Sequence, residues 1–375
     1  MKAKNSKQDR FVIIMAGGRG ERFWPVSREK TPKQLITLLG GRSFLQQSVD
    51  RVLPLVPLKN IYIITNTVQA PEVRRQLPKL PKENVIAEPV GRDTCAAVAL
   101  GAAIVGARSL TGVMAVLPAD HLIPSPKRFQ KVLSDAFEVA SRGQVMVTIG
   151  IPPTEPATGY GYIHVGEALA PTAGTKLSQT KISKVQKFVE KPNEETAEGY
   201  LKSGEYFWNA GMFIWSVPTI LAGLQAHCPE LGEACQRWLK VAGTPRLNRV
   251  LAKEYPAIKK ISVDFALLEK ANNVVVADGD FAWDDLGAWT ALARHLKPDA
   301  EGNCVVGNLV QVDSARNLVF DARTKRRTTI TLVGITDSII VETDDSLLVA
   351  HKSQAQKIKN LVRQLSESKA HKHLV

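Results

Sequence analysis

Short apolar runs alternate with longer amphipathic stretches along the first 150 residues. The runs are rich in Val, Ile and Leu and begin at Phe11 (FVIIM), Ile61 (IYIIT), Asn84 (NVIA), Val113 (VMAVL) and Val145 (VMVTIG). Continuous apolar runs of this length are typical of strands buried on both faces. Helical spacing is clearest over 94–109 and 125–141, and the second stretch has Pro126 in its first turn. The pattern predicts an α/β fold with a mostly parallel sheet covered by helices.

The pattern changes near Pro298. From Gly302 to Ala350 short strand-like runs recur with little helical spacing, and a basic amphipathic stretch follows over about 354–365. Such runs indicate a small all-β module, either a barrel or a solenoid. We therefore expect three parts: a disordered basic tail over 1–10, an α/β domain over 11–297, and a small all-β domain with a terminal helix over 298–375.

The net charge bears on the kind of ligand that the protein can bind. Lysine and arginine number 49 against 36 acidic residues, a net charge of +13. This surplus attracts polyanions in general. No arginine-rich run interleaved with aromatics marks a nucleic-acid site, and small phosphorylated substrates fit the surplus equally well, so charge alone does not decide. No apolar stretch reaches the roughly 20 residues that cross a bilayer, and the first run is too short for a signal peptide. We expect a cytoplasmic protein without membrane contact, and the four scattered cysteines predict neither disulfides nor a zinc site.

A glycine-rich segment, MAGGRGERFWPVSREKTPKQL, follows the first predicted strand directly. Glycines leave backbone N–H groups unobstructed, which suits a triphosphate. A dinucleotide-binding fingerprint would need glycine where Phe23 stands, and a P-loop would need Gly-Lys-Ser/Thr, so both motifs fail. The sequence predicts a phosphate cradle formed by Ala16, Gly17, Gly18 and Gly20, with positive charge from Arg22 and Lys33.

This segment resembles the signature of the nucleotide-sugar pyrophosphorylases. The form Glu21-Arg22-Phe23-Trp24-Pro25, followed by Pro32-Lys33-Gln34, is similar to that of bacterial mannose-1-phosphate guanylyltransferases. The resemblance extends over about 11–362. It implies a Rossmann-like nucleotidyltransferase core, a C-terminal β-helix-like domain and a homodimer formed through the C-terminal region. It also implies transfer of GMP from GTP to mannose 1-phosphate with release of pyrophosphate, with Arg22 and Lys33 contacting the phosphates.

Two aspartates are candidate ligands for Mg²⁺. Asp120 follows the run VMAVL, and ligands of open α/β sheets bind at such strand ends. The segment FAWDDLGAW resembles the family's Trp-x-Asp-x-Gly motif, which implies that the second ligand is Asp285. Asp284 then either orients the ligand or begins the next helix. Mg²⁺ uses one or two carboxylates and completes its coordination with water and phosphate oxygens. A lone aspartate after a strand is otherwise a common turn residue.

The segment AEPVGRDTCAAVALGAA is the candidate base-binding segment. The Glu88 carboxylate can accept the adjacent N1–H and N2–H donors of guanine. Asp93 and Thr94 stand where a helix cap is expected, so capping is the alternative to nucleotide binding; the resemblance implies that this segment lies against the base. Arg92 remains open between a phosphate contact and a surface charge.

Four later segments resemble the family's sugar site: TGYGYIHV from Thr158, KFVEKP from Lys187, WNAGMFIW from Trp208 and SVDFALLEK from Ser262. A carboxylate can bind adjacent sugar hydroxyls, and an ammonium suits the sugar phosphate. Each residue alone could be an exposed charge, a cap or a turn residue. We expect Phe213, Trp215, Phe265 and Leu268 nearby to be core. The residues that the resemblance assigns to the sugar phosphate are Gly159, Tyr160, Glu190, Lys191, Asn209 and Asp264.

Three alternatives remain. The chain could act on another sugar 1-phosphate, such as that of glucose or a heptose. It could be a catalytically silent protein that binds GDP-mannose and regulates an enzyme, although Arg22, Lys33, Asp120 and Asp285 are all present. A charge-driven nucleic-acid role has no recognition motif to support it.

Overall fold

The computed structural model describes residues 9–170, 177, 180–325 and 328–375. Most of the expected disordered tail, residues 1–8, lies outside them, and the first strand already begins at Arg10. The chain divides into two compact units. The first comprises Met1–Gly17, Gln46–Ala119 and Ile123–Trp283, and the second comprises Gly18–Leu45, Asp120–Leu122 and Asp284–Val375.

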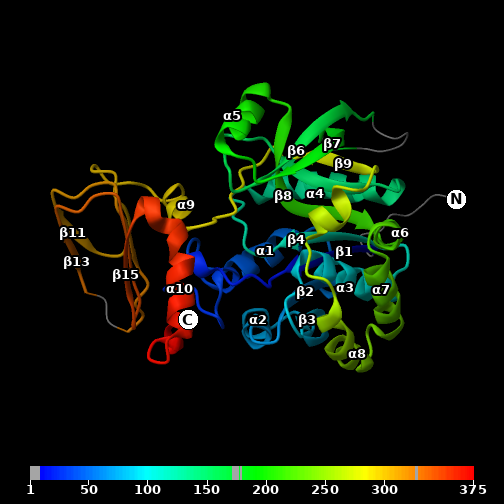
Figure 1. Ribbon diagram of the computed structural model, residues 1–375, viewed down its shortest axis with the longest axis horizontal. Helices are drawn as coiled ribbons and strands as arrows, with labels where there is room; N and C mark the ends of the chain where they lie inside the picture. The colour runs from blue at the N-terminus through cyan, green and yellow to red at the C-terminus, as the bar shows by residue number, and fades with distance from the viewer. Residues whose placement is uncertain (1–8, 171–176, 178–179, 326–327) are drawn as a thin grey trace. The chain divides into compact units, whose positions relative to one another are not determined.

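A nine-stranded sheet forms the centre of the first unit (Figure 1). Its order is β3-β2-β1-β4-β8-β5-β9-β7-β6. The neighbours β3, β2, β1 and β4 are parallel, as predicted, and so are β5 and β9. The bounds are β1 Arg10–Met15, β2 Ile61–Asn66, β3 Val85–Glu88, β4 Val113–Pro118, β5 Met146–Ile151, β6 Gly161–Ala168, β7 Ile182–Glu190, β8 Tyr206–Ser216 and β9 Val274–Asp278.

The expectation of a mostly parallel sheet needs correction for the later strands. Strand β8 runs antiparallel to both β4 and β5, and β6 and β7 pair antiparallel with each other. Antiparallel partners can lie beside a parallel sheet without a crossover helix between them. The sheet is therefore mixed, and its antiparallel pairings all involve β6, β7 or β8.

Helices pack on this sheet, and α3 shares a large apolar core with it. The alanine-rich α3 packs against β1, β2 and β4, whereas α4 packs against β4, β5, β8 and β9. Small side chains on α3 allow close approach to the sheet, and the residue facing Gly101 is Ile13. Helix α1, Phe44–Val52, begins in the second unit; the others are α2 Ala70–Gln76, α3 Asp93–Arg108, α4 Pro126–Arg142, α5 Glu194–Ser203, α6 Val217–His227, α7 Pro229–Val241 and α8 Arg246–Glu254.

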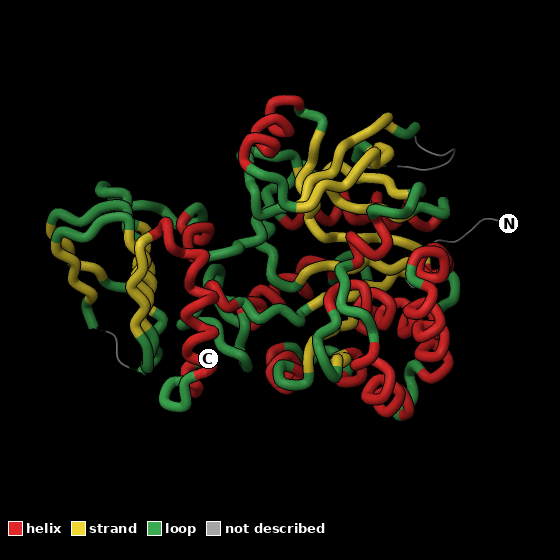
Figure 2. Tube along the Cα trace, in the orientation of Figure 1, coloured by secondary structure: helices red, strands yellow, loops and turns green. Residues whose placement is uncertain are grey.

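The second unit contains a short parallel β-solenoid (Figure 2). Strands β10, β12 and β14 stack in parallel, as do β11 and β13, and β15 closes the larger sheet antiparallel to β14. Of the two possibilities left by the sequence, the structure thus has the solenoid. The bounds are β10 Cys304–Val306, β11 Leu309–Val312, β12 Leu318–Asp321, β13 Ile330–Val333, β14 Ser338–Glu342, β15 Leu347–His351, α9 Trp289–Ala293 and α10 Ile358–Glu367.

The glycine-rich segment shares a core with the solenoid inside the second unit. Phe23 and Trp24 are buried in the same apolar cluster as Trp289, Phe320 and Ile358. The Trp289 indole donates to the Trp24 carbonyl at 3.0 Å. The loop is therefore anchored on the C-terminal module by packing as well as by hydrogen bonding. Among the residues that the structure describes, no helix is both long and apolar enough to span a membrane.

Candidate active site

The glycine-rich segment leaves β1 and turns sharply at Gly20. Gly17, Gly18 and Arg19 are exposed, so their backbone N–H groups are accessible, and the Gly18 carbonyl accepts from Gln34 Nε2 at 3.0 Å. Gly20 has φ +62°, and a Cβ atom there would lie 2.6 Å from both the backbone nitrogen and the Cβ of Lys33. Glycine is therefore required both by the left-handed conformation and by the close approach of the lysine.

A pocket of about 380 Å³ opens beside this turn, entirely within the second unit. It brings together Arg22, Lys33, Asp120 and Asp285, which come from three separate segments of the sequence. The remaining lining residues are Arg19, Gly20, Glu21, Phe23, His121, Leu286, Gly287 and Lys359. We call it the phosphate pocket.

The Lys33 ammonium joins the two aspartate segments. Its Nζ lies 2.9 Å from the Asp120 carboxylate and also donates to the Asp285 backbone carbonyl. Only 5% of Lys33 is exposed, and its Nζ lies 5.9 Å from the Phe23 ring centre and 5.8 Å from that of Phe44. Burial would raise the pKa of Asp120, but the nearby Lys33 and His121 outweigh it, so this pKa lies below its ordinary value. Asp120 is thus held ionised.

A short backbone bridge aligns the two aspartates. Leu122 N–H donates to the Asp284 carbonyl at 2.9 Å, and Asp284 N–H donates back at 3.1 Å. The Asp284 side chain is fully engaged: it accepts from Leu286 N–H at 2.8 Å, and its other oxygen binds Arg294 and His295. Asp284 therefore shapes the turn that carries Asp285, and its oxygens already have protein partners.

The donor set of the phosphate pocket suits a hard divalent cation bound with phosphate. Asp120 and Asp285 offer carboxylate oxygens, and no group of three or more His, Cys, Asp and Glu side chains arranged for a metal occurs in the described part of the chain. Two carboxylates without a full protein cage match Mg²⁺ coordination that is completed by water and substrate oxygens. Arg22 lines the pocket with its guanidinium 3.4 Å from the Gly287 carbonyl, and its Nε is buried without a partner among the residues that the structure describes.

The candidate base-binding residues lie in the first unit. Glu88 ends β3 and is 7% exposed, and the Tyr255 hydroxyl donates to its carboxylate. A Cβ atom on Gly17 would lie 3.5 Å from the other Glu88 oxygen, so the carboxylate adjoins the glycine turn. Burial raises the pKa of Glu88 to about 7, although the Tyr255 hydrogen bond opposes the shift. This carboxyl group therefore changes charge near neutral pH.

The start of α3 links the base segment to the candidate sugar site. Asp93 has φ +65°, and its carboxylate accepts from Thr94 N–H at 2.8 Å. Thr94 Oγ1 accepts from Val263 N–H at 2.9 Å, next to Asp264. Asp93 thus makes a local contact at the helix start, while Thr94 orients the Asp264 segment. Arg92 donates to the Pro256 carbonyl.

Four candidate sugar residues converge in the first unit. Asn209 Nδ2 donates to Asp264 Oδ1 at 2.7 Å. A Cβ atom on Gly161 would lie 2.7 Å from Glu190 and 3.6 Å from Asn209, so these two flank the same glycine. Lys191 has φ +45° and pairs with Glu190. Burial, reinforced by the Glu190 and Asp93 charges, raises the pKa of Asp264 against the opposing effect of Asn209.

Aromatic side chains adjoin this cluster, and the sequence predictions missed some of them. Tyr160 contacts Trp208 and Trp283, with ring centres 5.0 and 5.4 Å apart. Gly159 is exposed, with open space where a Cβ would lie. Phe213, Trp215 and Leu268 are buried as predicted, but Phe265 is 45% exposed, so its assignment to the core is wrong.

The exposure of Phe265 follows from local helix geometry. Residues Asp264–Leu268 form one turn of π-helix, which is wider than an α-helical turn. In an α-helix Phe265 and Leu268 would share a face at i,i+3 spacing, but the wider turn separates them. The aromatic ring beside Asp264 is therefore available to a ligand, a signal that α-helical spacing concealed.

Comparison with known proteins places the chain. A family model described as nucleotidyl transferase matches residues 11–301, and one described as a MannoseP isomerase/GMP-like beta-helix domain matches residues 307–365. The mannose-1-phosphate guanylyltransferase of Escherichia coli (strain K12) is 36% identical over 372 residues, covering 97% of this chain and 75% of that protein. The xanthan biosynthesis protein XanB of Xanthomonas campestris pv. campestris is 35% identical over 363 residues, covering 96% of this chain and 74% of its own length.

A solved protein structure is similar over nearly the whole chain. That of a mannose-1-phosphate geranyltransferase from Thermus thermophilus has a TM-score of 0.82 and 33% identity, covering 96% of this chain and 100% of that one. The predicted nucleotidyltransferase core with a C-terminal β-helix-like domain is confirmed. Enzymes of this family generally use a divalent metal ion. The chain belongs to the nucleotidyl transferase family, and its relatives include the bacterial mannose-1-phosphate guanylyltransferases.

Proposed function

We propose that this protein transfers GMP from GTP to mannose 1-phosphate, forming GDP-mannose and pyrophosphate, with Mg²⁺ as the metal. The observation that carries the proposal is the phosphate pocket, where a buried lysine and two aspartates from distant segments meet beside the glycine turn. The names of the relatives at 35–38% identity support the choice of substrates.

The reaction is an in-line displacement at the α-phosphorus of GTP. A phosphate oxygen of mannose 1-phosphate forms the new bond, and the bond to the β-phosphate oxygen breaks with its electron pair. The nucleophile is already ionised near neutral pH, so the site needs no general base. The required work is to bring the polyanions together and to neutralise the leaving pyrophosphate.

The pocket residues are suited to that work. Asp120 and Asp285 would hold Mg²⁺, which supplies charge neutralisation and orientation of the phosphates. Lys33 and Arg22 would contact the phosphates, and the backbone of Gly17, Gly18 and Gly20 would cradle them. The predicted part of Ala16 in this cradle is not supported, because its N–H already donates to the Ile64 carbonyl at 2.7 Å and its carbonyl accepts from Thr65 Oγ1 at 2.9 Å. Because Lys33 is partnered by Asp120, we expect its ammonium to exchange part of that contact for phosphate oxygens when substrate binds.

Specificity would come from the carboxylates of the first unit. Glu88 would accept the two adjacent donors of guanine, with Asp93 and Thr94 along the nucleotide. Glu190, Asn209 and Asp264 would bind the sugar hydroxyls, Lys191 the sugar phosphate, and Gly159 and Tyr160 would lie against the ring. Carboxylates already hydrogen-bonded to Asn209 and Tyr255 are held in fixed orientations, which favours directional recognition.

A matrix of four nucleoside triphosphates against mannose, glucose and heptose 1-phosphates tests this function. Pyrophosphate release is followed with Mg²⁺ present and after its removal by chelation. We expect turnover with GTP and mannose 1-phosphate that stops without Mg²⁺. Preference for another sugar phosphate would reassign the substrate. Binding of GDP-mannose without turnover of any pair would instead identify a silent regulator.

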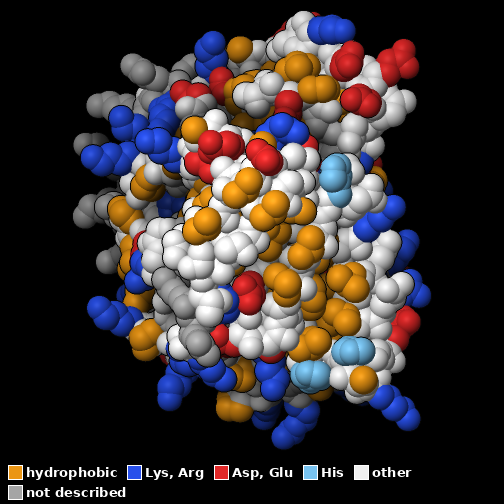
Figure 3. Space-filling model, turned by 90° about the vertical axis from the view of Figure 1, so that its left-hand side faces the viewer, with side chains coloured by type: hydrophobic (Ala, Val, Ile, Leu, Met, Phe, Trp, Pro, Cys, Tyr) orange, Lys and Arg blue, Asp and Glu red, His pale blue; other side chains and the backbone are white. Residues whose placement is uncertain are grey.

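We also propose that residues 11–297 are the catalytic domain, that residues 298–375 are the β-helix-like domain, and that two copies associate through the latter. The solenoid exposes apolar side chains on β11, β13 and β15, each more than half exposed: Val310, Val312, Val333, Leu347 and Val349. In Figure 3, where the left-hand side of Figure 1 faces the viewer, hydrophobic side chains are spread over the surface. Exposed apolar patches on soluble proteins often mark protein–protein contacts.

Sedimentation equilibrium checks the association. We expect a dimer for the native chain and a monomer for a Val333→Glu, Val349→Glu double variant with an unchanged circular dichroism spectrum. A monomeric native chain would remove the dimer from the proposal without affecting the chemistry. Cytoplasmic location, which the nucleotide substrates and the four free cysteines favour, is tested by fractionating cells.

A further inference from the structure

A lysine from the C-terminal helix lines the phosphate pocket. Lys359 lies in the first turn of α10 and contributes to the same pocket as Arg22, Lys33, Asp120 and Asp285. It also lines a neighbouring pocket of about 420 Å³, together with Arg19 and Glu21. Lys359 therefore stands where the two pockets adjoin, although it lies near the opposite end of the sequence from the glycine turn.

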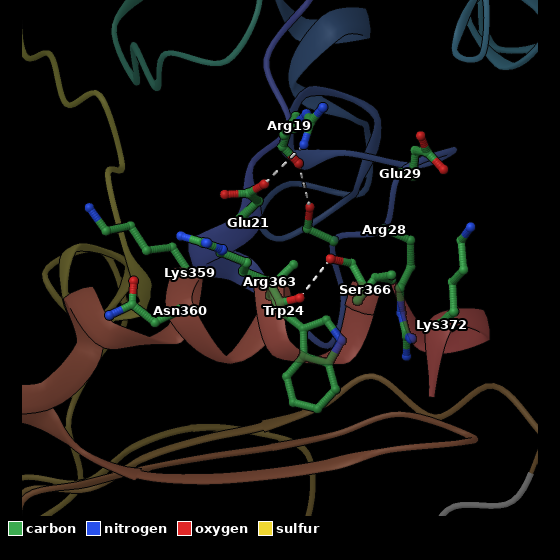
Figure 4. Close-up of a pocket in the computed structure, with 13 residues that line it drawn as sticks. Arg19, Glu21, Trp24, Arg28, Glu29, Lys359, Asn360, Arg363, Ser366 and Lys372 are labelled. Carbon is green, nitrogen blue, oxygen red and sulfur yellow. Dashed lines mark hydrogen bonds and ion pairs between the residues drawn. The ribbon is translucent and has the colours of Figure 1, made fainter. Parts of the chain in front are cut away.

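Packing of α10 fixes this position. Ile358, Leu361, Val362 and Leu365 pack in the core shared with Phe23 and Trp24, and α10 lies against the 3₁₀ turn Glu21–Phe23. The apolar stripe holds one face of the helix on the module. In Figure 4 the Lys359 and Arg363 side chains both leave α10 on the side where Glu21 lies, and the Lys359 ammonium points away from Glu21 and Arg19.

The chain after α10 forms hydrogen bonds with the loop that carries Trp24 and Arg28. The Trp24 indole donates to the Leu374 carbonyl at 2.8 Å, and Arg28 donates to the same oxygen. Arg28 also pairs with Asp345 at 2.7 Å. The glycine turn and α10 are thus joined by the core at one end and by hydrogen bonds at the other, which limits how far Lys359 can move from the pocket.

Lys359 differs from the other cationic side chains of the phosphate pocket in its interactions. Lys33 contacts Asp120 and the Asp285 carbonyl, Arg22 contacts the Gly287 carbonyl, and Arg19 lies 3.6 Å from Glu21. Over the described ranges of the chain, Lys359 has no side-chain hydrogen bond or ion pair. A cation beside a pocket for phosphates, with its three N–H donors unused, is available to an anionic ligand.

We propose that Lys359 is a further catalytic residue, which contacts the departing pyrophosphate of the nucleotide and neutralises its charge. The inference rests on the proposed function. As the mannose 1-phosphate oxygen bonds to the α-phosphorus, the electron pair of the broken bond passes to the pyrophosphate oxygen, and no proton is transferred. A lysine beside that oxygen stabilises charge that increases as the bond breaks. The β-helix-like module then contributes directly to catalysis.

The test compares Lys359→Met with Lys357→Met, which removes the same charge from an exposed position just before α10, outside both pockets. For Lys359→Met we expect kcat/KM for GTP to fall by about 30-fold and KM for pyrophosphate in the reverse reaction to rise by about 10-fold, the scale of one charge-assisted contact. Lys359→Arg should recover most of both losses, and Lys357→Met should stay within about twofold.

Direct titration of inorganic pyrophosphate into each protein by calorimetry gives a readout that needs no turnover. Weaker binding to Lys359→Met alone supports the contact, whereas equal binding to the native chain and to both variants overturns it. If the native chain shows no turnover with any sugar phosphate, the proposed function fails, but the titration still decides whether Lys359 binds the anion. If Lys359→Met has a lowered melting temperature, Lys359→Arg replaces it in the test. Weak pyrophosphate binding by Lys359→Arg would then also overturn the proposal.

Discussion

The pKa values of acids in the phosphate pocket and in the carboxylate-rich region of the first unit are shifted in opposite directions. In the pocket, Lys33 lies 2.9 Å from Asp120, and the pKa of Asp120 falls below its ordinary value. In the first unit, Glu88 and Asp264 have neutral polar partners, and burial raises the pKa of both. The phosphate pocket therefore favours the ionised form of Asp120, and the first unit favours the protonated forms of Glu88 and Asp264.

This difference matches what each region is proposed to bind. A metal ion and a triphosphate need permanent charges of both signs, which an ion pair maintains while partly desolvated. Guanine and sugar hydroxyls are neutral donors, and a carboxylate that lacks a cationic partner gains most from accepting their hydrogen bonds. The comparison therefore predicts that charge-removing substitutions affect catalysis in the pocket and affect binding in the first unit.

The largest effect is expected from Lys33→Met. Removing the ammonium deletes a phosphate contact and leaves Asp120 without its cationic partner, so kcat should fall by about 10³-fold, the scale for loss of one preorganised donor. Steady-state assays of pyrophosphate release measure it, with the exposed Lys30→Met as the charge-matched control. A decrease in kcat below tenfold would mean that Lys33 has only a structural role.

Substitutions of the adjacent Asp284 and Asp285 should affect stability and activity, respectively. Asp284→Asn weakens the contacts of the buried Asp284 carboxylate with the partly exposed Arg294 and His295, so the free energy of unfolding should fall by about 2 kcal/mol, the scale of hydrogen bonds to a charged group. Asp285→Asn should leave the denaturant midpoint nearly unchanged but reduce kcat by about 10²-fold, since it removes a proposed metal ligand. Chemical denaturation and assays on the same preparations compare the two. The reverse pattern would exchange the roles that we assign to them.

Glu88 gives a pH-dependent test in the first unit. Its pKa of about 7 lies above the ordinary value, so the folded protein binds this proton more tightly, and the group's contribution to stability falls as pH rises between about 4.5 and 7. Guanine recognition needs the ionised form, so Kd for GTP should rise by up to tenfold for each pH unit below about 7. In Glu88→Gln this dependence should vanish. Measuring both proteins in the same buffers cancels the titration of GTP itself.

Phe265→Ala should have the smallest effect. The ring is 45% exposed and lies beside Asp264, so its loss should raise KM for mannose 1-phosphate by about threefold and leave KM for GTP unchanged, in line with partial loss of apolar contact area. Leu268→Ala, at a buried position of the same turn, should instead lower thermal stability. Equal substrate constants in Phe265→Ala and the native enzyme would assign the ring to a surface without a ligand.

The sequence predicted the parts of the fold that depend on local pattern. Buried strands such as FVIIM form β1, and the Pro126 signal begins α4 at that residue. It did not predict the antiparallel β8, because pairing direction depends on partners distant in the chain. The apolar pattern left a barrel and a solenoid open, the resemblance implied a β-helix-like domain, and parallel registers such as Cys304↔Leu318 confirm it.

The same limit applies to the candidate site. The structure brings Lys33, Asp120 and Asp285 to one pocket. The sequence proposed Lys33 from its charge near the glycines and Asp120 from its place after a strand, whereas Asp285 was implied by the resemblance. The hydrogen-bond partners of a side chain cannot be predicted from the sequence. Asp284 and Asp285 are adjacent, and only the fold shows that the Asp284 carboxylate binds Arg294 and His295. Lys359 was missed because nothing in its local sequence connects a C-terminal helix with a phosphate pocket.

Electron paramagnetic resonance of Mn²⁺, used in place of Mg²⁺, tests the central claim most directly. In the presence of GTP, the native chain should immobilise one Mn²⁺ per molecule. Asp120→Asn and Asp285→Asn should each lose most of this signal, and Glu88→Gln at saturating GTP should retain it. An unchanged Mn²⁺ signal in both aspartate variants would contradict the assignment of the phosphate pocket as the site of the metal and the triphosphate.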